Sequence, residues 1–221
     1  VKAGSETASG IIIRRGETMP KYGVTSVDYE LGLEEGVPYL TYTFREGTVV
    51  VSERIRGFES IGTNWVHLAG VLDDSDHQLR LYVDAKRVAY KRPVTLVAQP
   101  LVFDVETTIG GGLSDGVTVE NGFTGEIDAV RVWDYPRRGI EVQITRSELL
   151  PEFDGIEPDA VRAPVRLFNF DTRGDYAHNS RYPYDWLTFW ANVGELQGDA
   201  AIVEVLFPPD RLDADDDGLS D

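Results

Sequence analysis

The chain contains no cysteine, only one methionine and three histidines, and no long run of apolar residues. Without cysteine, no disulfide can staple the fold and no thiol can act as a nucleophile. The histidines at 67, 77 and 178 lack the spacing of a zinc site. No stretch predicts a membrane span, and none has the succession of basic, apolar and small residues that predicts a signal peptide. Disulfide-stabilised and zinc-stabilised folds and thiol chemistry are therefore excluded.

Positive charge is also scarce. Lysine and arginine together number 21 against 38 aspartate and glutamate residues, so the formal net charge is −17. A strongly negative chain repels nucleic acid and anionic membrane surfaces. The composition therefore favours divalent cations and neutral ligands as partners.

The hydrophobic pattern consists of short alternating segments separated by turns, which is typical of an all-β protein. Side chains alternate in type through residues 39–44 and 79–83, and residues 49–51, 65–72 and 88–90 form further short apolar segments. Gly47 and the pair Asp84 and Ala85 mark hairpin turns between these segments. Strands so close in sequence pair as antiparallel neighbours, so we expect a two-sheet antiparallel β-sandwich.

Three blocks of these strands carry a family resemblance. They are Asn64–Val71, Leu79–Asp84 and Gly125–Trp133, and their order and spacing resemble laminin G-like jelly-roll domains of the concanavalin A-like lectin and glucanase superfamily. The resemblance implies a jelly-roll sandwich over residues 1–150. The family usually turns on glycine where this chain has Ala85. Residues 1–4 look like the middle of an opening strand, so we expect the first strands of the domain to be missing.

Residues 151–209 form a second region. Pro164–Asp171 resembles the segment that opens many laminin G-like repeats, an apolar strand ending in Phe-Asp. The residues that follow have too little alternation for a second sandwich. We expect the region to pack on the first sandwich as extra strands or a covering loop, anchored by Trp186, Phe189 and Trp190. The alternatives are the opening of a following repeat and an interdomain linker.

Residues 210–221 have the spacing of a calcium loop. Oxygen ligands are expected at positions one, three, five, seven and nine of such a loop, which here are Asp213, Asp215, Asp217, the Leu219 carbonyl and Asp221. Gly218 occupies the sixth position, where the chain must turn sharply. The segment resembles the start of a thrombospondin type 3 repeat or a dockerin-type loop, which implies bound Ca²⁺ and a longer parent protein. The alternative is a solvated acidic tail.

Glu126 and Asp128 resemble the beginning of the three-carboxylate set on the catalytic strand of the glucanases in this superfamily. Retaining hydrolysis needs two carboxyl groups about 5 Å apart. The third acid of the set falls on Val130, or on Arg131 if the strand is bulged, and neither residue can attack an anomeric carbon. The set is incomplete, so we expect no enzymatic activity.

The resemblance instead implies a structural role for Asp128. Many members of the superfamily hold a calcium ion with the equivalent aspartate and with backbone carbonyls near the start of the domain. An aspartate on an apolar strand also needs a cation or a hydrogen-bonding partner if it is buried. Asp171 and Asp175 are further candidates for oxygen ligands. The alternative is a carboxylate on a solvated face, or one paired with Arg131 or Arg80.

Aromatic residues are the candidates for ligand contact, because lectin-type jelly rolls stack aromatic rings against sugars. Tyr182, Tyr184 and Trp186 lie in the most loop-like aromatic segment and are the first choice for a contact surface. Other aromatics are candidates by type only, with a core position as the alternative role for each: Tyr22, Tyr39, Tyr42, Tyr90 and Trp133.

Three functional hypotheses follow. The first is a non-catalytic, calcium-binding adhesion or recognition module of a larger secreted or cell-surface protein, whose partners are calcium, flanking domains of the same polypeptide, and a glycan or another surface protein. The second is a carbohydrate-binding module of a secreted hydrolase. The third is a structural subunit of an extracellular filament or layer that self-assembles through exposed strand edges.

Overall fold

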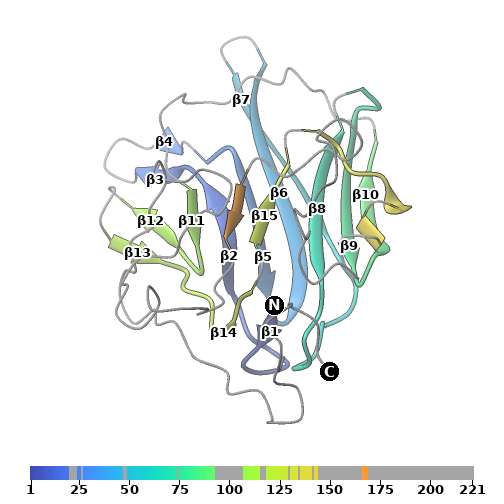
Figure 1. Ribbon diagram of the computed structural model, residues 1–221. Coiled ribbons are helices and arrows are strands. Elements are labelled where there is room, and N and C mark those ends of the chain that lie inside the picture. The colour runs from blue at the N-terminus through green and yellow to red at the C-terminus, as the bar shows by residue number, and fades with distance from the viewer. Residues whose placement is uncertain are drawn as a thin grey trace, which may run out of the picture.

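A computed structural model describes residues 1–19, 24–25, 27–46, 49–73, 75–92, 107–114, 118–128, 130–133, 135–140, 142–143 and 166–168. Within these ranges the regular structure is β-strand apart from short helical pieces at residues 139–140 and 142–143 (Figure 1). None of the described segments forms a helix with the length and apolar character that a membrane crossing requires.

Sixteen strands are described in this part of the chain. In chain order they are β1 (Lys2–Ala3), β2 (Gly10–Arg15), β3 (Glu17–Met19), β4 (Val24–Thr25), β5 (Tyr29–Glu34), β6 (Val37–Glu46), β7 (Val49–Arg56), β8 (Leu68–Asp73), β9 (Gln78–Val83), β10 (Lys86–Lys91), β11 (Thr107–Ile109), β12 (Gly112–Ser114), β13 (Thr118–Glu120), β14 (Gly125–Glu126), β15 (Val130–Val132) and β16 (Arg166–Phe168).

Two antiparallel sheets dominate the fold. One has five strands in the order β11-β2-β5-β6-β7, and the other has three in the order β10-β9-β8. In Figure 1 the long strands β6 and β7 run through the centre, with β8, β9 and β10 on one side of them. A smaller sheet, β13-β12-β3-β4, lies on the other side and includes one parallel pair, β12 with β3. The predicted all-β, two-sheet antiparallel sandwich is confirmed.

The main core lies between the five-stranded sheet and β9. In β6 and β9 alternate residues point into this core, as the period of two in the sequence predicts. Leu79 and Leu81 of β9 are fully buried and pack in one cluster with buried residues of the five-stranded sheet. The sheet contributes Ile13, Leu31, Leu40, Tyr42 and Ile55.

The predicted turn at Asp84 and Ala85 joins β9 to β10 in the structure. Both residues have positive φ, 48° for Asp84 and 64° for Ala85. A two-residue hairpin with two left-handed residues matches the twist of the flanking strands, and glycine is the residue that adopts this conformation most readily. Ala85 therefore occupies a position where its side chain has a conformational cost.

The prediction of a strand beginning at Trp65 is wrong, because β8 begins at Leu68. The backbone just before β8 makes other hydrogen bonds. The Val66 amide donates to the Val1 carbonyl at 2.9 Å, and the His67 amide donates to Asp84 Oδ1 at 3.0 Å. These bonds tie the segment to the N-terminal residue and to the β9–β10 turn instead of to a neighbouring strand.

Gly125–Trp133, expected as one strand, is two strands with different partners. Glu126 of β14 lies opposite Lys2 of β1, whereas Val130 of β15 lies opposite Phe168 of β16. The chain leaves one pairing and enters another between them, so the ladder is interrupted at Ile127 and Asp128. The division of the chain at residues 150 and 209 stays a prediction.

Candidate functional site

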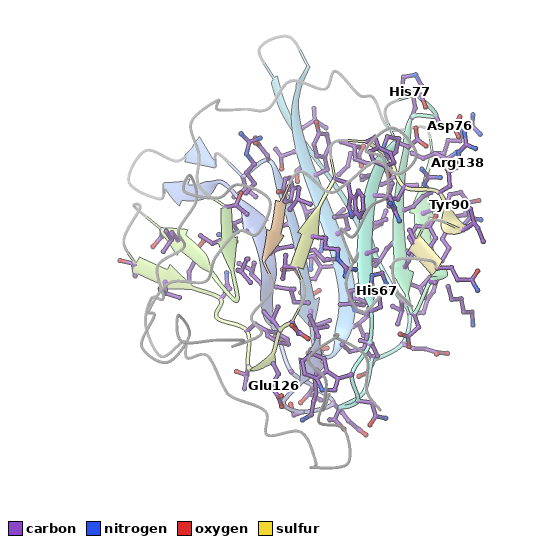
Figure 2. All side chains as sticks on the ribbon, viewed as in Figure 1. His67, Asp76, His77, Tyr90, Glu126 and Arg138 are labelled. Atoms are coloured by element: carbon purple, nitrogen blue, oxygen red, sulfur yellow. The ribbon has the colours of Figure 1, made fainter. Side chains whose placement is uncertain are left out.

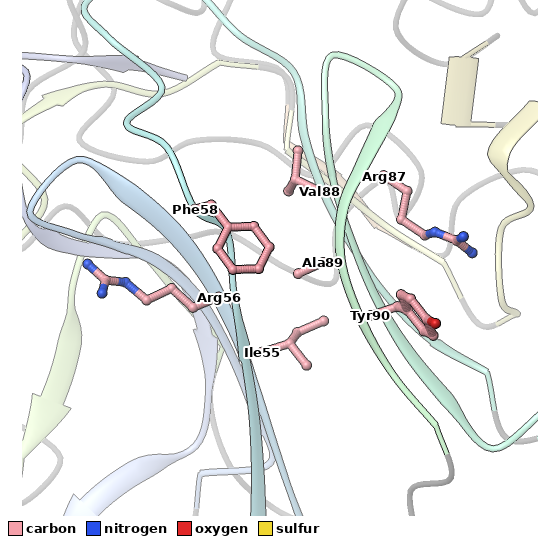
Figure 3. A pocket seen from close by; sticks show the side chains of 7 residues that line it. All are labelled: Ile55, Arg56, Phe58, Arg87, Val88, Ala89 and Tyr90. Atoms are coloured by element: carbon pink, nitrogen blue, oxygen red, sulfur yellow. The ribbon is translucent and has the colours of Figure 1, made fainter.

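An open groove lies between β7, at the edge of the five-stranded sheet, and β10, at the edge of the three-stranded sheet (Figure 3). Its volume is about 450 Å³. Ligand sites commonly enclose about 300 to 1,000 Å³, so the groove has the size of a binding site. Its lining residues are Ile55, Arg56, Phe58, Arg87, Val88, Ala89 and Tyr90.

The floor of the groove is apolar and rigid. Ile55 on β7 is a buried member of the main core, and Val88 and Ala89 on β10 pack against the same cluster. Lys91 of β10 also forms an ion pair with Glu53 of β7, which joins the two strands. The groove is therefore built on two strands that share one core.

Phe58 is the most unusual residue of the groove, because 91% of its surface is exposed. In Figure 3 its ring lies over the space between β7 and β10, near the side chains of Ile55 and Ala89. Leaving a large aromatic ring in water forgoes about 1.5 to 3 kcal/mol of burial free energy. An exposed aromatic ring beside a groove is typical of a binding site, where a ligand buries the ring.

Polar groups stand on both flanks. In Figure 3 the Arg56 side chain extends to one side of the groove, whereas Arg87 and Tyr90 extend to the far side of β10. The Arg87 guanidinium lies 4.8 Å from the centre of the Tyr90 ring, and Tyr90 is 61% exposed. A cation stacked on an exposed aromatic ring retains its hydrogen-bond donors for a ligand.

The other face of the five-stranded sheet carries a network of charged residues. Arg54 lies 3.9 Å from the centre of the Tyr39 ring, and the Tyr39 hydroxyl donates to Glu30 at 2.5 Å. Burial raises the pKa of Tyr39 above its ordinary value, and the bond to Glu30 raises it further. Glu30 in turn pairs with the buried Arg14. These groups bond to one another, so the network stiffens the sheet behind the groove.

Most of the predicted site residues lie outside the described part of the chain. They are the calcium-loop candidates Asp213, Asp215, Asp217, Leu219 and Asp221, the aromatic candidates Tyr182, Tyr184 and Trp186, and the additional acids Asp171 and Asp175. Calcium at residues 213–221 and ligand contact at residues 182–186 stay predictions.

Asp128 is described and is exposed, just after β14. Burial lowers the pKa of the Val1 amino group, while the nearby carboxylates of Asp128 and Asp84 oppose that change. The same amino group donates to the Val66 carbonyl at 2.8 Å. Among the described residues, no three His, Cys, Asp or Glu side chains are grouped closely enough to hold a metal, and calcium at Asp128 stays a prediction.

The carboxylates that resemble a glucanase set do not form a row in the structure. Glu126 pairs with Lys2 at 2.6 Å on β14, and Asp128 follows in the interruption. Val130 and Arg131 lie on β15, a different strand. Figure 2 places Glu126 well away from Tyr90 and hence from the groove. The described part of this segment supplies no pair of acids on a common strand.

The structure separates the aromatic candidates by exposure. Tyr39 and Tyr42 are buried, as the alternative role predicted, whereas Tyr90 is exposed at the groove. Trp133 is stacked with Arg137, whose guanidinium lies 3.9 Å from its ring. Phe58 was not among the candidates. The sequence gives only a weak indication that Phe58 is exposed, because it is a single large apolar residue between Gly57 and Glu59, directly after a strand.

Comparisons with known proteins agree with this architecture. One solved structure, a candidate carbohydrate-binding protein from Bacteroides ovatus, aligns with 84% of this chain at a TM-score of 0.51 and 15% identity. The aligned part spans 56% of that protein. An S-layer domain-containing protein from Clostridium thermocellum aligns over 66% of each chain with 18% identity, but its TM-score of 0.34 does not establish a shared fold. No curated protein matches the chain.

Residues 1–143 match a laminin G-type family model described as the concanavalin A-like lectin/glucanases superfamily. The matched region contains both main sheets and the whole of the groove. It also contains the three sequence blocks at residues 64–71, 79–84 and 125–133. The chain belongs to the concanavalin A-like lectin/glucanases superfamily.

Proposed function

We propose that this chain is a non-catalytic recognition module of a secreted or cell-surface protein, and that it binds glycan chains in the groove between β7 and β10. The observation that carries this proposal is the exposed Phe58 ring on an open groove flanked by guanidinium groups. Sugar rings have apolar C–H faces that stack on aromatic rings and hydroxyls that accept hydrogen bonds from arginine. The groove offers both kinds of contact.

The loop that presents Phe58 is held on both sides. Before it, the Gly57 amide donates to the Pro38 carbonyl at 2.8 Å. After it, the Ser60 hydroxyl donates to the Glu6 carbonyl at 2.8 Å, and the Ile61 amide donates to the Gly36 carbonyl at 3.0 Å. A fixed loop loses little conformational entropy when a ligand covers its aromatic ring. The exposure of Phe58 is thus built into a preorganised surface.

The family and the Bacteroides ovatus likeness support the proposal at the level of the fold. A jelly-roll fold serves both binding and hydrolysis, so the choice between them depends on the site. Here the segment with glucanase-like acids has Glu126 paired with Lys2, and Val130 in place of a further acid. Binding without catalysis is therefore the better-supported function. No specific contact in the described strands favours filament assembly, which stays an alternative.

Alanine substitution at Phe58 tests this function. Retention on a panel of immobilised polysaccharides is measured for the natural chain, for Phe58→Ala and for Trp65→Ala. Trp65 is the matched control because it is also an exposed aromatic, at 49%, but does not line the groove. We expect Phe58→Ala to weaken retention by roughly tenfold or more and Trp65→Ala to leave it unchanged.

Melting curves of all three proteins show whether the fold is intact. Equal retention of the natural chain and a folded Phe58→Ala variant would exclude the groove as the glycan site. Absence of retention on every polysaccharide would contradict the proposed function itself.

A further inference from the structure

The positive charges of this acidic chain gather beside the groove. Residues 86–92, which include all of β10, contain four basic residues, Lys86, Arg87, Lys91 and Arg92, and no acidic residue. The whole chain has only 21 basic residues and a net charge of −17. A short strand without acids is therefore a strong local departure from the composition of the chain.

Few of these charges are neutralised by neighbouring side chains. Lys91 pairs with Glu53. Within the part of the chain that the structure describes, Lys86, Arg87 and Arg92 have no ion pair, and the contact of Arg87 is with the Tyr90 ring. On the opposite flank, Arg56 lies 3.6 Å from the Glu34 carboxylate and shares it with Arg54, which stacks on Tyr39 and does not line the groove. The β10 flank of the groove therefore keeps excess positive charge, and Arg56 places one further guanidinium on the β7 flank.

We infer that the ligand of the groove is an acidic glycan, in which Phe58 stacks on a sugar ring and Arg87 binds a carboxylate group of the chain. This ligand class rests on the proposed glycan-binding function. Arginine suits the role because its planar guanidinium can donate two parallel hydrogen bonds to one carboxylate. A neutral glycan would leave Arg87 without a counter-charge in the complex.

The net charge of the protein does not prevent such binding. At physiological salt, charges more than about 8 Å apart are largely screened from each other. Contacts in the groove are therefore governed by the nearby guanidinium groups rather than by acids elsewhere on the surface. The same distribution gives selectivity, because an anionic chain is repelled from the rest of the molecule and accepted at one edge. The net charge alone favours neutral ligands, whereas the local charge beside the groove favours an acidic one.

The positions of the flanking residues indicate an extended ligand. Arg56 and Arg87 extend to opposite sides of the groove, with Phe58 between them (Figure 3). A ligand that contacts all three must cross both β7 and β10. A polymer with repeated carboxylates satisfies this geometry, whereas a single sugar fills only the central space.

Calorimetric titration with short oligogalacturonate and with the same oligomer after methyl esterification of its carboxyl groups tests the ligand class. The two probes share one sugar backbone and differ only at the carboxyl groups, where the ester replaces the negative charge with a methyl ester. Oligomers of alginate, with and without esterification, provide a second pair. We expect the acidic forms to bind at least tenfold more tightly than the esters, with an affinity that falls as salt is added.

Arg87→Gln and Arg92→Gln form the matched pair of variants. Both remove one exposed charge from the same basic segment, but only Arg87 lines the groove. Arg87→Gln should reduce affinity for the acidic oligomer roughly tenfold and leave affinity for the ester unchanged, since a charge-assisted hydrogen bond is lost. Arg92→Gln should change either affinity less than about twofold.

Several results would contradict the proposal that the groove binds an acidic glycan. They are equal affinity for acid and ester, equal effects of the two variants, or failure of both acidic oligomers to bind. Binding of dextran sulfate alone would contradict the carboxylate assignment. Poly-glutamate binding that does not depend on Phe58 would indicate an acidic protein partner instead. Phe58-dependent binding of the neutral esters would reject the acidic ligand while preserving the proposed glycan-binding function.

Discussion

Arg14 and Glu30 lie opposite each other on β2 and β5, and Arg14 Nε donates to Glu30 Oε2 at 2.6 Å. A second donor of the same guanidinium, Nη1, binds Glu120 at 2.5 Å. Glu120 is on β13, in the smaller sheet. Gly112 leaves room for this contact, because a side-chain carbon there would lie 2.2 Å from Nη1. One buried cation thus ties the five-stranded sheet to its neighbour.

Replacing Arg14 with methionine should destabilise the fold severely. The Arg14 residue is 5% exposed, and its loss leaves Glu30 and Glu120 as partly buried carboxylates without their counter-charge. Removing one member of a buried ion cluster costs about 3 to 5 kcal/mol. The free energy of unfolding, measured by urea titration, checks this value.

The control is Lys2→Met, which removes a cation whose side chain is 41% exposed and pairs with Glu126. An exposed ion pair contributes about 1 kcal/mol or less, so this variant should remain close to the natural chain. A loss of the same size in both variants would show that Arg14 is not a special connection between the sheets.

Replacing Ala85 with glycine should stabilise the protein. Ala85 has a φ of 64°, where a side chain costs about 1 to 2 kcal/mol. Glycine removes that cost but adds about 0.4 to 1 kcal/mol of freedom to the unfolded chain. We expect a net gain of up to roughly 1 kcal/mol in thermal or urea unfolding, because the first term is the larger.

Ala69→Gly is the matched control for this change. Ala69 and Ala85 pack against the same small cluster of Val71, Tyr82 and Val142, but Ala69 lies within the strand β8. Glycine within a strand should lower stability by about 0.5 to 1 kcal/mol. A decrease in both variants would mean that the packing of Ala85 outweighs its backbone conformation.

The same turn shows how far the sequence predicts the fold. Alternation from Leu79 to Val83, followed by a turn at Asp84 and Ala85, is local information, and the structure confirms it. Arg14 and Glu120 are 106 residues apart, and no local pattern connects them. The interruption at Ile127 and Asp128 likewise depends on which strands lie alongside. Local periodicity predicts strands, whereas pairing between distant strands requires the tertiary structure.

The candidate site was harder to predict for a related reason. Aromatic residues are candidates by type, and the sequence does not show that Tyr39 is buried while Phe58 and Tyr90 are exposed. The net charge does not predict the charge of the ligand either, because it is a sum over the whole chain and does not show the basic segment at residues 86–92. The groove exists only where β7 and β10 from two different sheets come together.

Asp73 should make the fold sensitive to acid. Burial alone would raise the pKa of its carboxyl, but bonds from the Ser75 hydroxyl and the Asp76 amide and the ion pair with Arg80 outweigh burial and lower the pKa. A carboxyl with a lowered folded-state pKa stabilises the protein above its unfolded pKa of about 3.9. That contribution is lost as pH falls through the folded-state pKa.

Asp73→Asn isolates this effect. The difference in melting temperature between the natural chain and Asp73→Asn should be largest near neutral pH and should shrink as pH falls below about 4. Ser75→Ala, which removes one of the donors to Asp73, should show a smaller difference with the same direction. A melting difference that is constant from neutral to strongly acidic pH would contradict the role of the ionised carboxylate.

Calcium should raise the melting temperature if the predicted sites hold it. Ligand that binds only the folded state adds about 2.7 kcal/mol of stability at a free concentration 100 times its dissociation constant. Asp128→Asn should reduce the calcium-dependent increase in melting of the sandwich, because it removes a carboxylate oxygen from the predicted calcium site. Asp217→Ala should remove the contribution of the loop at residues 213–221 and leave the sandwich folded.

Asp76→Asn provides the control, since Asp76 is an exposed acid in the turn between β8 and β9 and belongs to neither predicted site. Differential scanning calorimetry with millimolar calcium, and with chelator at the same ionic strength, separates specific binding from general screening of a chain with a charge of −17. Screening alone would stabilise every variant equally. An increase that magnesium or monovalent salt reproduces, or one that persists in both Asp128→Asn and Asp217→Ala, would exclude calcium as a ligand of these two sites.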